Sequence, residues 1–132
     1  MNGNKIVLDT NIIVFASKQL IDVEKLINSF DVFYVSIITF MEAYSYNFSN
    51  NNEKLLIDEL FNNIEIIEVN KEIADLAINI RNNKNKKIKL PDAIILATSK
   101  YLNLPLLTDD WDDFQNIDSE ISIQNMNNFK KL

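Results

Sequence analysis

The residues best suited to chemistry in this sequence are acidic. Five of them fall just beyond short apolar segments or in the first turn of an expected helix: Asp9, Glu42, Asp92, Asp110 and Asp113. Carboxylate oxygens are hard ligands that suit Mg²⁺ or Mn²⁺ and not soft metals. Several carboxylates packed together without a cation repel one another. One or two ions held there could activate water and neutralise the charge on a phosphodiester under attack.

The composition excludes most other catalytic groups. The chain of 132 residues has no histidine and no cysteine, so Cys/His zinc sites, Ser-His-Asp or Cys-His catalysis and disulfides are all excluded. The absence of cysteine suits a reducing cytoplasm. No apolar run approaches the roughly 20 residues of a membrane span, and the N-terminus leads straight into a strand-like segment, so we expect a cytoplasmic protein without a signal peptide.

The elements that must position the acids alternate along the chain. Short runs of apolar and β-branched residues predict strands over residues 5–9, 32–36, 64–69, 106–108 and 121–123. Apolar residues at helical spacing predict helices over 11–16, 21–28, 39–47, 53–61, 71–81 and 91–101, with Asp22 as an N-cap and Pro91 at the first helical position. We expect the polar end of the chain to be a frayed end or an exchange arm. The pattern predicts one α/β domain, residues 1–132, with a mostly parallel sheet.

The predicted sheet brings the acids together. In open α/β sheets, ligands bind beyond the carboxyl ends of the strands. Asp9 ends the first strand, Glu42 follows the second by about one helical turn, and the aspartates of residues 109–113 follow the fourth. Asp92 lies in the first turn of the helix that precedes the fourth strand. These acids therefore map to one edge of one sheet.

Each acid also has a purely structural interpretation. Thr39 to Glu42 has the spacing of a capping box, Asp92 complements a helix dipole, and Asp110 and Asp113 have capping spacing too. Asp9 is the hardest to explain in this way, because an acid at the end of a buried strand costs free energy unless it is paired or metal-bound. Only the joint placement of the acids favours a site.

Four blocks of the sequence resemble the PIN domain family, and specifically its VapC-type toxins. Residues Ile6–Asn11 resemble the family's opening strand with its Asp-Thr-Asn signature, and Ser36–Glu42 resembles the Ser/Thr-rich segment that ends in the second acid. Leu90–Thr98 resembles the third block, an Asp followed by an apolar helix, and Leu106–Phe114 resembles the last block, Thr-x-Asn/Asp-x-x-Asp/Glu-Phe. The four blocks stand in the family's order and cover nearly the whole chain.

The resemblance implies a PIN-like three-layer α/β domain with a five-stranded, mostly parallel sheet flanked by helices. It implies a Mg²⁺- or Mn²⁺-dependent endoribonuclease that hydrolyses single-stranded RNA, is paired with an antitoxin protein as a toxin–antitoxin system, and forms a homodimer. By carry-over, the catalytic acids are Asp9, Glu42, Asp92, Asp110 and Asp113, with Asp9, Asp92, Asp110 and Asp113 on the metal. Thr10, Asn11, Thr39 and Thr108 would orient them. Because four aspartates crowd the last block, Asp109 could replace Asp110.

The basic residues gather in one segment just before Asp92. Five of the thirteen lysines and arginines lie within residues 81–89: Arg81, Lys84, Lys86, Lys87 and Lys89. The segment has no acid, although the chain as a whole has a net charge of −6. One interpretation is a solvated helix end whose lysines complement the dipole. The other is an RNA backbone contact that guides substrate to the carboxylates.

Two rival functions fit parts of the pattern. A catalytically silent PIN-like module would bind RNA or a protein without cutting it, and metal-dependent cleavage would exclude it. A different Mg²⁺ enzyme, such as a phosphatase or a phospho-accepting receiver, fits less well. A haloacid-dehalogenase-type phosphatase wants an Asp where this chain has Asn11, and a receiver wants paired acids where it has Asn4 and Lys5.

Overall fold

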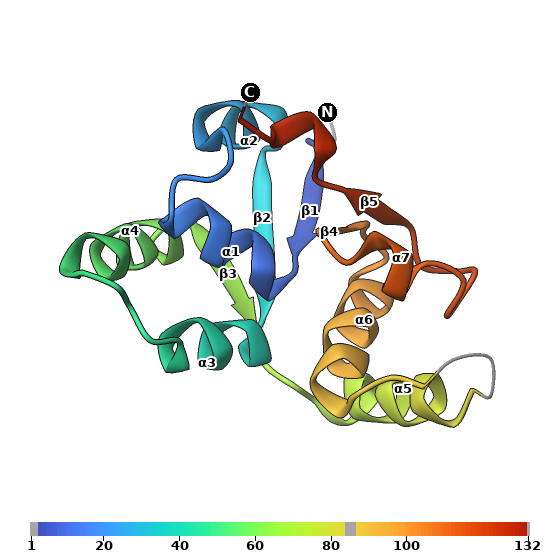
Figure 1. Ribbon diagram of the computed structural model, residues 1–132. Helices are drawn as coiled ribbons and strands as arrows, with labels where there is room; N and C mark the ends of the chain where they lie inside the picture. The colour runs from blue at the N-terminus through green and yellow to red at the C-terminus, as the bar shows by residue number, and fades with distance from the viewer. Residues whose placement is uncertain (1–2, 84–86, 132) are drawn as a thin grey trace.

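One parallel sheet organises the protein. The computed structural model describes residues 3–83 and 87–131. The strands stand in the order β3-β2-β1-β4-β5, and every adjacent pair is parallel (Figure 1). Their bounds are β1 Lys5–Leu8, β2 Val32–Ser36, β3 Ile64–Ile67, β4 Leu106–Thr108 and β5 Ile123–Asn125. Because β1 is central and all strands are parallel, the residue after β1 lies at the middle of the carboxyl edge.

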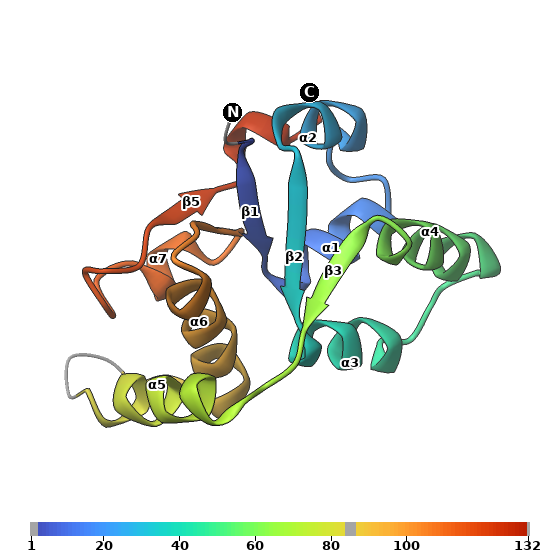
Figure 2. The ribbon, with the colours of Figure 1, turned by 180° about the vertical axis from the view of Figure 1, so that it is seen from behind.

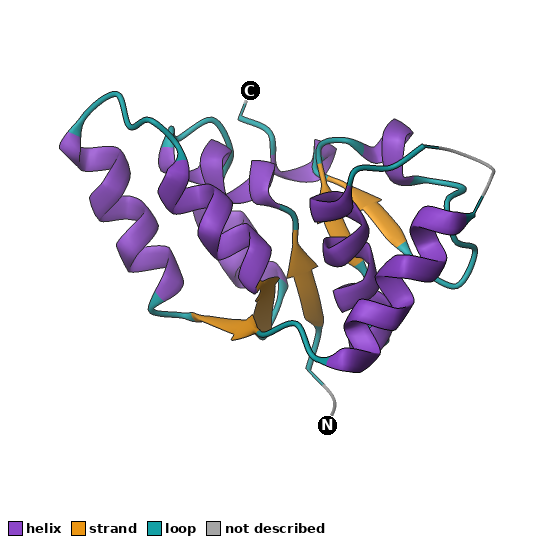
Figure 3. Ribbon diagram, turned by 90° about the horizontal axis from the view of Figure 1, so that it is seen from below, coloured by secondary structure: helices purple, strands orange, loops and turns teal. Residues whose placement is uncertain are grey.

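Helices cover both faces of the sheet, which confirms the expected three-layer α/β fold (Figure 3). They are α1 Thr10–Ser17, α2 Val23–Ser29, α3 Ile37–Ser45, α4 Asn51–Phe61, α5 Lys71–Asn82, α6 Leu90–Leu102, α7 Trp111–Phe114 and the 3₁₀ helix η1 Asn127–Phe129. Seen from behind, α5 and α6 lie on the side of the sheet away from α1 (Figure 2). No helix in the described part of the chain is long and apolar enough to cross a membrane.

Two hydrophobic cores lie on the two faces of the sheet. Successive strand residues point to opposite faces, and β1 shows this directly. Ile6 and Leu8 pack in one core with α1, α2 and α4, whereas Val7 packs in the other with α5 and α6. All three side chains are at most 3% exposed. A strand buried on both faces is fixed in register, so it holds the residue that follows it in place.

The helix starts correct one structural interpretation of the acids. Helix α3 begins directly after β2, because the Ser36 hydroxyl caps it by accepting a hydrogen bond from the backbone N–H of Ile38 at 3.1 Å. The expectation of a start at Thr39 was wrong, so Glu42 lies inside the helix and is not the acid of a capping box. The Asp22 cap is confirmed, since its side chain accepts a hydrogen bond from the Lys25 N–H.

The end of the chain also differs from the expectation. It was expected to fray, but Met126 and Phe129 are buried at 3% and 7% exposure in the core beneath α1 and α2. Lys130 forms an antiparallel bridge with Ile21, and the Asp22 N–H donates to the Phe129 carbonyl. These two apolar residues are isolated among polar ones, so the sequence has no periodic pattern that would predict their burial. Strand β5 lies at Ile123–Asn125, two residues later than the expected 121–123, where it pairs with β4.

Candidate active site

Asp9 lies at the end of the central strand β1 and is the N-cap of α1. Its side chain is buried at 4% exposure. Oδ1 accepts a hydrogen bond from the Thr10 backbone N–H at 2.8 Å, and Oδ2 accepts one from the Thr108 hydroxyl at 2.7 Å. A carboxylate offers about four lone-pair sites, so these two bonds fix its orientation and leave room for a further ligand.

The neighbouring strand β4 supplies the residue that holds Asp9. The strands pair so that Leu8 faces Leu107, and this places Thr108 next to Asp9. The buried Thr108 hydroxyl accepts a hydrogen bond from the Asp110 backbone N–H at 2.9 Å while its own proton goes to Asp9. One threonine thus joins the end of β1 to the turn that carries Asp110.

A second hydroxyl chain positions Glu42. The Thr10 hydroxyl lies 2.7 Å from Glu42 Oε1 and 3.1 Å from the hydroxyl of Thr39, which is fully buried. A hydroxyl has one proton, and the carboxylate is the stronger acceptor. Thr10 therefore donates to Glu42, and Thr39 donates to Thr10. The first turn of α1 orients an exposed acid on α3.

Asn11 holds the turn after β4 in place. Its amide nitrogen Nδ2 donates to Asp110 Oδ2 at 3.2 Å, and its Oδ1 accepts from the Asp109 backbone N–H at 3.3 Å. Asp110 is the N-cap residue of α7, yet its side chain makes no capping bond. Its carboxylate is turned toward α1 instead. The structure therefore places the Asp110 side chain, and only the backbone of Asp109, against Asn11.

These residues surround a pocket of about 280 Å³ at the carboxyl edge of the sheet. It is lined by Asp9, Thr10, Asn11, Val14, Phe15, Glu42, Asp92 and Asp110. Val14 and Phe15 were not expected from the sequence. They stand four residues after Thr10 and Asn11, on the same face of α1. This spacing is the feature of the sequence that could have predicted that they line the pocket. The pocket has an acidic rim and an apolar side.

Burial raises the pKa of Asp9 to about 7. The hydrogen bonds from Thr108 and Thr10 oppose this rise, and the nearby negative charges of Asp92 and Asp110 add to it. Desolvation disfavours the charged form of a carboxyl, and like charges disfavour it further. A divalent cation would remove both penalties, so the surroundings of Asp9 favour a bound cation.

The other two aspartates of the pocket are shifted in the same direction. Burial raises the pKa of Asp92, and the charges of Glu42, Asp110 and Asp113 raise it further, whereas the charge of Lys89 lowers it. Burial likewise raises the pKa of Asp110, and so does the charge of Asp113. Asp92 and Asp110 therefore link the set electrostatically, because each is coupled to Asp113 and Asp92 is also coupled to Glu42.

Asp113 and Lys89 do not line the pocket, but their charges act on its aspartates. Asp113 is exposed on α7 and does not line the pocket, although its charge acts on Asp92 and Asp110. Lys87 and Lys89 are exposed, and Lys89 is the member whose charge reaches Asp92. Arg81 donates from Nε to the Ile88 carbonyl at 3.2 Å. Lys84 and Lys86 fall outside the described residues.

The donor chemistry of the pocket fits a hard divalent cation, but the carboxylates are not closed around one point. Among the described residues, no three acidic side chains stand close enough to hold one ion together. Mg²⁺ keeps several of its waters and is commonly bound through only one or two carboxylates. Asp9, Asp92 and Asp110 are the residues that would hold such an ion, directly or through its waters.

Comparisons with known proteins identify a family and similar folds. The PIN domain model matches residues 6–120. A chain of the DNA-bound VapBC from Salmonella typhimurium is 20% identical with a TM-score of 0.78, and one of the promoter-bound VapBC2 from Rickettsia felis is 21% identical with a TM-score of 0.76; each match covers 92% of this chain and 98% of the other. A chain of a toxin–antitoxin complex from Klebsiella pneumoniae is 28% identical with a TM-score of 0.68, covering 88% and 94%.

No curated protein sequence matches the chain. The family assignment therefore depends on the PIN model, which spans most of the chain, and the solved structures add the likeness of fold. The matched region begins in β1 and includes all four sequence blocks, and the pocket residues come from those same blocks apart from Val14 and Phe15. The chain belongs to the PIN domain family.

Proposed function

We propose that this protein is a divalent-metal-dependent endoribonuclease that hydrolyses phosphodiester bonds of single-stranded RNA, and that it is the toxin of a toxin–antitoxin pair. PIN domains are generally nucleases, so the family supports a nuclease toxin without specifying the metal or the nucleic acid. The observation that carries the proposal of a metal-dependent enzyme is that four carboxylates line one pocket: Asp9, Glu42, Asp92 and Asp110. Their shared charge calls for a cation.

The metal, Mg²⁺ or Mn²⁺, would lower the pKa of a bound water and stabilise charge on the phosphodiester oxygens. The residues of this chain have distinct parts in that chemistry. Asp9 and Asp92 would hold the ion, with Asp110 across the pocket. Thr108 keeps Asp9 turned toward the pocket, and Asn11 does the same for Asp110.

Glu42 is placed to orient the attacking water. It is exposed at the pocket rim, and Thr10 donates to only one of its oxygens, Oε1. The other oxygen is available to accept a proton from water. With no histidine in the chain, carboxylates are the groups in the pocket that can accept a proton near neutral pH.

RNA as substrate is supported by the placement of positive charge. The chain is acidic overall, which opposes binding of phosphates. Lys89, however, stands beside Asp92, and Arg81 and Lys87 belong to the same segment. A single strand passing the pocket would therefore meet lysine close to the point of cleavage.

A protein partner is supported by the solved structures, which are toxin–antitoxin complexes, and by a second pocket. That pocket, of about 330 Å³, lies between α1, α2 and α4, and its lining includes Ile21, Val23, Leu56 and Leu60. An amphipathic helix of an antitoxin would bury its apolar face there. We propose in addition that the chain forms a homodimer.

The decisive experiment is RNA cleavage by the purified chain after chelation, with Mg²⁺ or Mn²⁺ added back. We expect the parent to cut only with metal. Asp9→Asn should lose at least about 100-fold in rate, because a lost metal ligand removes several kcal/mol of transition-state stabilisation. The matched control is Asp75→Asn, an exposed residue on α5 that pairs only with Lys71 among the described residues, and it should cut like the parent.

Cleavage that survives in Asp9→Asn with resupplied metal would contradict the proposed site. Absence of metal-dependent cleavage by the parent, on total RNA as well as on single-stranded oligonucleotides, would favour the silent binding module instead. The observation that favours such a binding module is that no three acidic side chains among the described residues stand close enough to hold one ion.

A further inference from the structure

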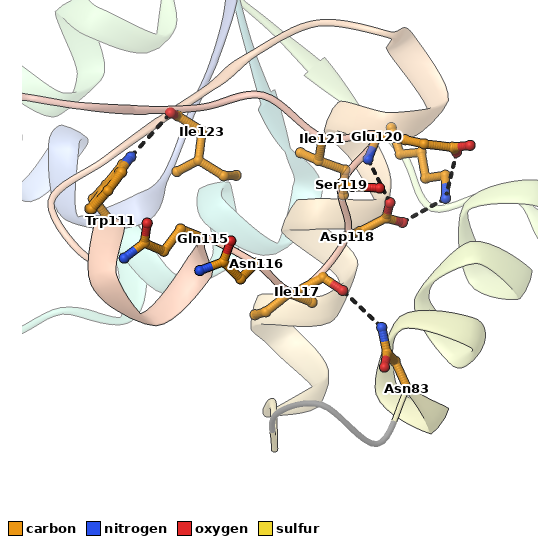
Figure 4. Close-up of a pocket in the computed structure, with 11 residues that line it drawn as sticks. Asn83, Trp111, Gln115, Asn116, Ile117, Asp118, Ser119, Glu120, Ile121 and Ile123 are labelled. Atoms are coloured by element: carbon orange, nitrogen blue, oxygen red, sulfur yellow. Dashed lines mark hydrogen bonds and ion pairs between the residues drawn. The ribbon is translucent and has the colours of Figure 1, made fainter.

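A pocket of about 690 Å³ lies between α7, the loop that follows it and Asn83 (Figure 4). It is more than twice the size of the carboxylate pocket. The two pockets are lined by consecutive residues at the start of α7, Asp110 in the carboxylate pocket and Trp111 in the larger one. On its far side the larger pocket reaches Asn83, which follows α5 within the basic segment 81–89.

One wall of this pocket combines a ring with side-chain amides. The half-buried Trp111 donates its indole N–H to the Ile123 carbonyl at 3.3 Å, which fixes the edge of the ring. Gln115 and Asn116 line the pocket beside it (Figure 4). Proteins that read single-stranded RNA stack unpaired bases on aromatic rings and bond the base edges with polar side chains. The wall has both components.

The charge of the opposite wall excludes a phosphate. Lys100 Nζ is bonded to Asp118 Oδ2 at 2.6 Å and to Glu120 Oε2 at 3.1 Å. One ammonium group faces two carboxylates, so the wall is negative overall and a phosphate would be repelled. A neutral base with N–H donors has no such penalty. The pocket therefore selects the base of a nucleotide and not its backbone.

The surroundings supply the backbone contact that the pocket lacks. Asn83 donates from Nδ2 to the Ile117 carbonyl at 2.8 Å, which ties the pocket loop to the basic segment. Arg81 and Lys87 are exposed in that segment. A strand leaving the carboxylates across α7 would have its base over the pocket and its next phosphates near these cations.

We propose that the pocket behind α7 binds one unstacked nucleobase flanking the cleaved phosphodiester, with Trp111 as the stacking surface and Gln115 and Asn116 reading the base edge. The inference rests on the proposed RNA substrate. It adds a specificity-determining subsite that the carboxylate pocket does not provide.

The single tryptophan of the chain makes the subsite directly observable. Asp9→Asn keeps the RNA intact, so this variant is titrated with a short single-stranded RNA in Mg²⁺. Tryptophan emission should be quenched, saturating in step with binding measured separately by anisotropy of labelled RNA. Inorganic polyphosphate, which has charge but no bases, should leave the emission unchanged.

Substitution gives an independent readout. Trp111→Leu should weaken RNA binding by roughly 5- to 100-fold, as expected for the loss of one base–aromatic stack. Tyr101→Leu is the matched control, because Tyr101 is an exposed aromatic residue on α6 that does not line the pocket. It should bind like the parent. A Trp111→Leu chain that fails to fold leaves the emission titration, which needs no change at Trp111, as the test.

RNA binding without any change in tryptophan emission, or equal affinities for Trp111→Leu and the parent, would overturn the subsite. So would failure of RNA to bind at all. Quenching by RNA in a chain that never cleaves it would refute the proposed nuclease and leave the subsite standing. Metal-dependent cleavage without quenching would support the proposed nuclease and refute the subsite.

Discussion

At the scale of single residues, Asp9 combines a structural role with a place in the candidate site. It caps α1 through Oδ1 and still keeps a place in the pocket through its remaining lone pairs. The side chains of Glu42 and Asp110 make no capping bond. Glu42 is bonded to Thr10 inside α3, and Asp110, although it is the N-cap residue of α7, is bonded to Asn11. Capping therefore does not account for these two carboxylates, whereas Asp92 does lie in the first turn of α6.

The raised pKa of Asp9 has a consequence for stability in the absence of metal. Its folded pKa is about 7 and its ordinary value is 3.8. Between these two values folded Asp9 binds more protons than unfolded Asp9, so its contribution to the free energy of unfolding falls as pH rises through this window. The loss from Asp9 is on the order of 4 kcal/mol. Asp9→Asn, which does not titrate, should escape it.

Urea unfolding at pH 5 and pH 8, with a chelator present, gives the free energy of unfolding of the parent and of Asp9→Asn. The effect of Asp9 is the difference between the two proteins, because all other groups titrate in both of them. The parent should lose more stability than Asp9→Asn between these pH values, and Asp75→Asn should behave like the parent. Divalent metal should restore the parent at pH 8 by binding the folded state. An equal pH dependence in the parent and Asp9→Asn would show that Asp9 is not held in this environment.

At the scale of elements, the order and type of the main strands and helices could be predicted because their signals are local. The strands Val32–Ser36 and Leu106–Thr108 have the predicted bounds. These are short apolar runs with clear edges. The end of the chain could not be predicted, because it is held by residues more than one hundred positions away: Lys130 bridges to Ile21, and the Phe129 carbonyl accepts from Asp22. Burial of isolated apolar residues is decided by tertiary packing.

The sequence was sufficient to predict which acids of the candidate site lie together. The carboxyl-edge rule needs only strand order along the chain, and it brought Asp9, Glu42, Asp92 and Asp110 to one pocket. The resemblance named Thr10, Thr39 and Thr108 as orienting residues, but which acid each hydroxyl contacts depends on side-chain directions across α1, α3 and β4, which the sequence does not give. Asp113 was expected on the metal, and its exposed position on α7 leaves that role a proposal.

At the scale of the whole molecule, charge is distributed unevenly. In a chain of net charge −6, the charge of Lys89 acts on Asp92 at the carboxyl edge of the sheet, and Lys87 is exposed two residues before it. A second group of lysines, Lys25 and Lys130, lies at the opposite end, beside α2 and η1. If RNA binds at the carboxyl edge, only the first group should affect its affinity.

Charge reversal separates the two groups. Lys87→Glu with Lys89→Glu should weaken single-stranded RNA binding and make the dependence of log affinity on log salt shallower by about 1.4, since each lost phosphate contact removes roughly 0.7. Lys25→Glu with Lys130→Glu changes the net charge equally and should leave that slope unchanged. Equal effects of the two pairs would indicate a response to net charge alone.

The central claim is that the carboxylates at the end of β1 and the start of α6 bind a divalent cation. Anomalous diffraction from crystals soaked in Mn²⁺ tests it most directly, with Asp9→Asn crystals as the control. We predict a Mn²⁺ peak within coordination distance of Asp9 and Asp92 in the parent and its loss in the variant. Mn²⁺ bound only at other carboxylates, with none between Asp9 and Asp92, would contradict the account.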